Sequence, residues 1–236
     1  MADSGFSFQK ILDDSKTVLT NPKQYFSSMA KEGGFVEPII KALVYGVIAG
    51  IISLIWSLLH LTVAASMLGG MFGSGVAGIM VLVYSVIGSV IAVFIGGIII
   101  LIISAICGGN TNFETNARVA ASLMVLSPIS ALLSVVGAFS YPFSAFITLI
   151  ISLYGLYLLY IALINALGAK KETAKIVSIV LAIIPVLMLL SALLCASAAS
   201  RYTESVIKDI PTGNSKEIKD MQEKIRELQE LQKKMK

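Results

Sequence analysis

The side chains that could carry acid–base, nucleophilic or metal chemistry are few in this chain, and their spacing assembles no active site. His60 is the only histidine, and Cys107 and Cys195 are the only cysteines. Catalysis needs a nucleophile, a base and an electrophilic group brought together, and no zinc-protease, nucleophile-elbow or phosphate-loop motif occurs. We therefore expect a non-enzymatic protein without catalytic, cofactor-binding or metal-binding residues.

Two of the few central charges have a helical spacing. Glu114 and Arg118 lie at i, i+4 where an apolar stretch begins. One interpretation is an ion pair at a helix end, which contributes about 0.2–0.5 kcal/mol. The alternative is contact with a lipid headgroup or a protein partner at the membrane surface. Between residues 42 and 199 the formal charges are limited to Glu114, Arg118, Lys170, Lys171, Glu172 and Lys175.

The elements that must position these side chains are membrane spans. Hydrophobic residues make up 56% of the chain and charged residues 14%, against about 45–50% and 25% in average proteins. A backbone in hydrocarbon must satisfy its own hydrogen bonds, so the spans should be helices. The sequence predicts an all-α, polytopic transmembrane helix bundle with about five spans, at residues 39–67, 77–106, 117–137, 143–167 and 176–198.

The distribution of basic residues predicts the orientation of these spans. Lysine and arginine occur before the first span and in the second and fourth loops, and the first and third loops contain none. Basic loops stay on the cytoplasmic side of a membrane. We therefore expect an integral protein of a prokaryotic cytoplasmic membrane with a cytoplasmic N-terminus. With five spans, the C-terminus then lies outside.

Residues 1–37 predict a cytoplasmic segment of amphipathic helices. Asn21 suits a helix N-cap and Pro22 the first helical position, so a second short helix should begin there and end at Gly33 and Gly34. It would present Phe26 on its apolar face. A helix of this kind can lie in the membrane interface, and the alternative is ordinary packing against the rest of the protein.

Small residues at four-residue spacing predict close helix packing within residues 38–200. Gly46 and Gly50 form one such pair, and Ala162 and Ala166 form another. The spacing predicts a packed bundle without showing which pair docks. Pro128, inside the third span, predicts a kink.

The chain end predicts a separate soluble helix. Residues 201–213 are expected to form a linker, and residues 214–236 a charged helix. Apolar residues at a and d positions make this helix a candidate for a short coiled coil, which would support homo-oligomers. The alternative is an isolated charged helix.

Three short motifs resemble the Yip-domain (Ypt-interacting protein) family, particularly its prokaryotic branch. Asn21 and Pro22 precede Phe26 just before the first span, as in the entry motif of the family. Gly108 and Gly109 introduce a polar loop that continues to Glu114 and Arg118, and Ser127 is followed by Pro128. The resemblance covers residues 21–199 and implies a five-span membrane protein with a cytosolic N-terminus and no established chemistry.

These observations favour a membrane-organising, scaffold or trafficking-like protein. It would act through membrane lipids, helix packing and self-association, with an unidentified protein partner. The eukaryotic Asp-Leu-Tyr-Gly-Pro motif does not occur, so the Rab-binding role of eukaryotic relatives is not carried over. The alternative is a small-molecule or ion transporter or channel, which Gly- and Pro-interrupted spans would suit. Nucleic-acid binding is not expected, because no basic stripe with interleaved aromatics occurs.

Overall fold

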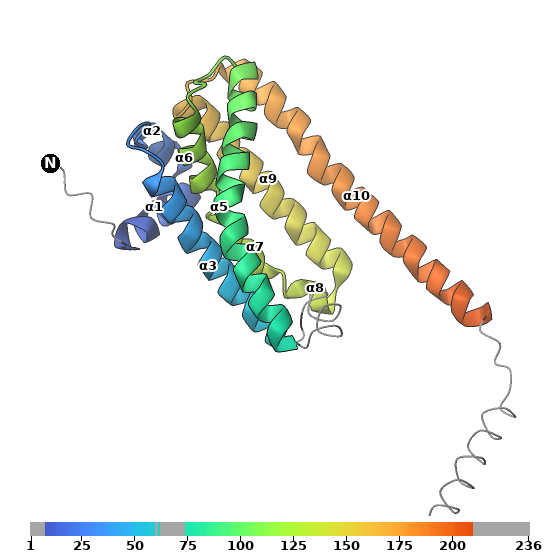
Figure 1. Ribbon diagram of the computed structural model, residues 1–236. Helices are drawn as coiled ribbons and strands as arrows, with labels where there is room; N and C mark the ends of the chain where they lie inside the picture. The colour runs from blue at the N-terminus through green and yellow to red at the C-terminus, as the bar shows by residue number, and fades with distance from the viewer. Residues whose placement is uncertain (1–7, 60, 62–73, 210–236) are drawn as a thin grey trace, which may run out of the picture. The chain divides into compact units, whose positions relative to one another are not determined.

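The computed structural model describes residues 8–59, 61 and 74–209, and the regular structure in these residues is helical (Figure 1). Two short helices precede the apolar part of the chain. The order is α1 (Phe8–Thr20), α2 (Pro22–Ser28), α3 (Val36–Leu58), α5 (Ser74–Ile106), α6 (Phe113–Leu123), α7 (Leu126–Leu133), α8 (Val136–Phe139), α9 (Tyr141–Asn165) and α10 (Lys171–Asp209).

The described residues contain 5 helical stretches long and apolar enough to cross a membrane. They are Val36–Leu58, Ile79–Ile106, Phe113–Phe139, Pro142–Asn165 and Lys171–Leu194. This confirms the all-α fold class and the five predicted spans. Contacts divide the chain into one unit ending at Leu189 and a second beginning at Leu190. The helices from α1 to α9 and the first part of α10 belong to the first unit.

The first span ends earlier than predicted. We expected it to continue to residue 67, but α3 ends at Leu58 with Leu59 as its C-cap. The 23 residues of α3 already reach about 35 Å at 1.5 Å per residue, which exceeds the hydrocarbon thickness of about 30 Å. His60 lies outside the described residues.

The third span is broken at the position that Pro128 predicts. Proline has no N–H, and its ring clashes with the carbonyl four residues earlier. The carbonyl of Met124 instead accepts a hydrogen bond from the Ser127 N–H at 2.9 Å, and α6 and α7 separate at residues 124–125. A second break between α7 and α8, at residues 134–135, was not predicted.

The last helix contradicts part of the predicted linker. We expected residues 201–213 to connect two domains, but α10 continues through Asp209. Residues 201–209 contain neither glycine nor proline, and Pro211 is the next residue that would end a helix. The candidate coiled coil in residues 214–236 lies outside the described residues.

Helices α3 and α5 pack closely through the first of the small-residue pairs. A Cβ on Gly46 would lie 2.7 Å from the Ser89 Cβ, and a Cβ on Gly50 would lie 3.1 Å from the Ser85 Cβ. The Ser85 hydroxyl donates to the Gly46 carbonyl at 2.9 Å. The partner that the sequence left open is therefore the serine pair of α5.

The buried core gathers where α1 and α2 lie against the ends of the spans. Phe26, Ala162, Leu163 and Ala166 are all fully buried in one cluster. α5 buries Val93, Ile100 and Ile103 but leaves many other apolar residues exposed, such as Ile91 and Ile95, as a lipid-facing surface requires.

The N-terminal helices pack against their own protein. Tyr25 and Phe26 are buried, as in the alternative that we weighed against an interfacial helix. α2 also ends at Ser28 with Met29 as its C-cap, so the prediction that Gly33 and Gly34 end it is wrong.

Candidate functional site

The N-terminal helices and two loops meet at one end of the bundle. The Asn110 N–H donates to the Leu167 carbonyl at 2.7 Å, and the Lys170 N–H donates to the Cys107 carbonyl at 3.0 Å. We call this the basic end, because the lysines of residues 10–41 and those of residues 170–175 lie there or in the adjoining helices. The structure thus places on one side the segments that the charge pattern grouped together.

Arg118 is the centre of a buried charge cluster at the basic end. Its guanidinium donates to a Glu37 oxygen at 2.7 Å, to a Glu114 oxygen at 3.2 Å and to the Gly34 carbonyl at 2.9 Å. The Gly34 N–H in turn donates to Glu114 at 2.6 Å. Only 5% of the Arg118 side chain is exposed, so the predicted i, i+4 pair is one part of a larger internal network.

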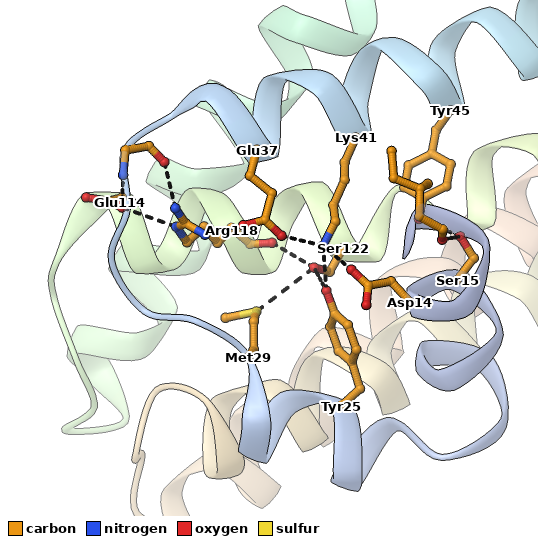
Figure 2. Close-up of polar contacts among 12 residues, drawn as sticks. Asp14, Ser15, Tyr25, Met29, Glu37, Lys41, Tyr45, Glu114, Arg118 and Ser122 are labelled. Carbon is orange, nitrogen blue, oxygen red and sulfur yellow. Dashed lines mark hydrogen bonds and ion pairs between the residues drawn. The ribbon is translucent and has the colours of Figure 1, made fainter. Parts of the chain in front are cut away.

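Lys41 extends the cluster toward α1 and α2 (Figure 2). Its ammonium lies 2.8 Å from an Asp14 oxygen, 3.0 Å from a Glu37 oxygen and 2.9 Å from the Tyr25 hydroxyl. Glu37 therefore bridges the two cations with one oxygen each. A lysine has three donors, and these three contacts match that number.

Tyr25 joins the charge cluster to the third span. Its hydroxyl lies 2.8 Å from the Ser122 hydroxyl, and the Ser122 hydroxyl also donates to the Arg118 carbonyl at 2.9 Å. α1 makes a parallel contact, because the Ser15 hydroxyl lies 2.8 Å from the Tyr45 hydroxyl. The two N-terminal helices are thus attached to α3 and α6 by polar contacts.

The charge cluster is closed. The cavity lined by Met29, Glu37, Lys41 and Arg118 measures about 10 Å³, roughly the room that one water molecule needs. Three carboxylates face two cations in this cluster, and removing one partner of such a pair leaves a buried charge unpaired. The arrangement can hold helices together, but it leaves no room for a substrate.

The first family motif sets the start of α2. The Asn21 side chain caps the helix by accepting from the Gln24 N–H at 3.3 Å, and Pro22 occupies the first turn. Phe26 is completely buried. The motif therefore fixes the helix that carries Tyr25 to Lys41.

The glycine motif shapes the loop between α5 and α6. Gly108 has a φ of +67°, and a Cβ on Gly109 would lie 2.6 Å from the Ser104 hydroxyl and 3.0 Å from the Leu167 carbonyl. The loop then continues into α6, whose N-cap Asn112 accepts from the Glu114 N–H at 2.9 Å. The glycines thus permit the loop packing that precedes Glu114 and Arg118.

Sequence reasoning missed Asp14, Tyr25, Glu37 and Lys41 as members of the cluster. Glu37 and Lys41 carried a signal, since they lie at i, i+4 in the first turns of an apolar helix, where a charge needs a partner. Asp14 carried none, because its contact with Lys41 depends on how α1 folds back.

The comparisons with known proteins give one match. The family model described as the Yip1 domain matches residues 16–193. This range begins within α1 and includes the loop with Gly108 and Gly109. It also includes the charge cluster, apart from Asp14, and it leaves out Ser15. No curated protein and no solved structure matches.

Proposed function

Because the chain belongs to the Yip1 domain family, we propose that this integral membrane protein is a non-enzymatic, membrane-organising scaffold. It would act through lipid contacts, helix packing and self-association. The prokaryotic cytoplasmic membrane, with the basic end facing the cytoplasm, stays our prediction of where it acts.

The observation that carries this proposal is the closed charge cluster. A binding or active site is an accessible cleft with a few placed polar groups, whereas the ionisable side chains around Arg118 and Lys41 enclose a cavity of only about 10 Å³. The buried charges attach α1 and α2 to the spans. The result is a cap whose outer surface carries Phe8, Lys10, Leu12 and Lys23, all exposed, and is free to meet lipid or protein.

Self-association in a bilayer tests this proposal. The full chain, carrying one fluorophore at its N-terminus, is reconstituted at low density and bleached molecule by molecule. We expect most spots to bleach in two or more steps at densities where a monomeric membrane protein bleaches in one. Single-step bleaching at every density would refute the scaffold proposal.

The second candidate, a transporter or channel, is favoured by one cavity. A space of about 140 Å³ near α7 and α9 has a mixed lining, with the hydroxyl-bearing residues Ser130, Ser134, Ser144 and Thr148 beside Leu133, Ile147 and Ile151. Thr148 lies about 10 Å along α9 from Tyr141, so the cavity opens at the end opposite the charge cluster. Solute flux into proteoliposomes that Ser134→Leu abolishes would support this candidate, and equal flux through empty vesicles would remove it.

A further inference from the structure

A groove runs between α9 and the first turns of α10, within the first unit. It has a volume of about 330 Å³. α9 contributes Leu153, Tyr157 and Tyr160 to its wall, and α10 contributes Lys175, Ser178 and Ala182. The groove lies on the surface that faces the surroundings of the bundle, because Tyr157 and neighbouring residues of α10 are half exposed.

The two ends of this groove differ in polarity. Lys175 lies in the second turn of α10, and Ala182 lies seven residues further along, about 10 Å deeper at 1.5 Å per residue. Tyr160 lies near the end of α9, and Leu153 is seven residues before it. A cation and a phenol hydroxyl therefore occupy the mouth at the basic end, and apolar side chains line the deeper part. A phospholipid has the same order, with a phosphate above its acyl chains.

The charges around the mouth favour an anion. Residues 170–175 contain three lysines, Lys170, Lys171 and Lys175, and one carboxylate, Glu172. Among the described residues Lys175 has no ion pair. The eight residues that line the groove include one cation and no carboxylate. A second copy docked across a two-fold axis would bring one Lys175 toward the other without an acid to pair them, whereas an anionic lipid would pair with it.

We propose that this groove binds one anionic phospholipid, with its phosphate at Lys175 and an acyl chain along Leu153 and Ala182. The inference rests on the proposed function and deepens it by naming the lipid class and the site of contact. Such a lipid would fill the exposed side between α9 and α10 and link their packing to membrane composition.

Native mass spectrometry of the delipidated full chain tests the groove. Phosphatidylglycerol and phosphatidylcholine with the same acyl chains are titrated separately. We expect the first phosphatidylglycerol to bind at least fivefold more tightly than the first phosphatidylcholine. Lys175→Gln should remove this preference, and Ala182→Trp, which fills the deep part, should weaken both lipids. Lys171→Gln and Ile183→Trp are the matched controls, because both residues are exposed on α10 and lie outside the groove lining.

Four results would overturn the proposal. They are equal affinity for the two lipids, an equal effect of Lys171→Gln and Lys175→Gln, full competition by soluble glycerol phosphate, and an Ala182→Trp chain that changes its oligomer mass while keeping its lipid. The last would assign the groove to a second copy. Counting bleaching steps in vesicles distinguishes a failure of the groove proposal from a failure of the scaffold proposal. If the protein shows no lipid selectivity but still self-associates, only the groove proposal is contradicted.

Discussion

Arg118 in the third span donates to Glu37 at the start of the first span across 2.7 Å, although 81 residues separate them in sequence. The other oxygen of Glu37 holds Lys41 at 3.0 Å. Glu37 thus joins Arg118, which contacts the loop before α3, to Lys41, which contacts α1 and α2. The family motif around Arg118 and the N-terminal helices become parts of one structure through this residue.

Removing the buried guanidinium should destabilise the protein. In Arg118→Met, Glu114 loses its cation and keeps only the Gly34 N–H, while Glu37 keeps one of its two cations, Lys41. Breaking a buried pair costs about 3–5 kcal/mol, and we expect about 3 kcal/mol, because Glu37 and Glu114 are 37% and 21% exposed and can regain water. Unfolding in mixed micelles measures this. Lys23→Met, at an exposed position of α2, is the control. A loss below about 1 kcal/mol would mean that the pair behaves like a surface ion pair.

The glycine contact between α3 and α5 should tolerate no added methyl group. A Cβ on Gly46 would lie 2.7 Å from the Ser89 Cβ, so Gly46→Ala should lower the midpoint of thermal unfolding. Ser89→Gly in the same chain should restore part of it by removing the opposing Cβ. Gly88→Ala is the matched control, since nothing lies within 4 Å of its Cβ and alanine favours a helix by about 0.5–1 kcal/mol. Equal effects of Gly46→Ala and Gly88→Ala would contradict the close approach.

Cys107 should react slowly with thiol reagents. It is 1% exposed, and burial raises the pKa of its thiol, so less thiolate is present at neutral pH than for a free cysteine. In a Cys195→Ser background, maleimide labelling should be at least about tenfold slower than for a cysteine at the exposed Thr20 position. Labelling should reach the rate of the Thr20→Cys chain after denaturation. Equal rates before denaturation would show that the loop opens readily.

The raised pKa of the Cys107 thiol also predicts how stability depends on pH. Because the folded state holds this proton more tightly, the thiol stabilises the fold fully below about pH 8.5, and stability falls above that.

The basic end should face the cytoplasm. With a cysteine at Lys23 on α2, an impermeant thiol reagent should label intact cells only after permeabilisation, because basic segments are retained inside. A cysteine at Ser215 should label without permeabilisation, since five spans place the tail on the other side. The reverse pattern would invert the topology, and labelling of both positions from one side would contradict the number of crossings.

Much of the fold could be predicted because lipid makes span formation a matter of local composition. The apolar stretches that became α5 and α9 are long and uninterrupted, and Pro128 marks a break that follows from its missing N–H. The end of α3 at Leu58 was mispredicted, since the apolar sequence continues past the length that a bilayer requires. Lipid and protein interiors favour the same residues, so hydropathy alone does not show where a helix stops.

The site was predicted less completely, because it depends on contacts between distant segments. Asn21 and Pro22 predicted the start of α2, and the spacing of Glu114 and Arg118 predicted an ion pair. The role of Tyr25, whose hydroxyl contacts both Lys41 and Ser122, depends on α2 folding against two spans. The pairing of Gly46 with Ser89 likewise needed the structure, since several small-residue pairs share the same spacing.

Amide hydrogen exchange of the reconstituted chain tests most directly that the charge cluster serves to attach the N-terminal helices. We predict that α1 and α2 are protected in the wild-type protein and that Asp14→Asn combined with Arg118→Met speeds their exchange strongly, while α9 keeps its protection. Lys10→Gln combined with Lys23→Met changes two exposed charges on the same helices and should leave exchange unchanged. Equal protection of α1 and α2 in the Asp14 and Arg118 double variant would contradict this claim, because it would show that the charge cluster does not hold them.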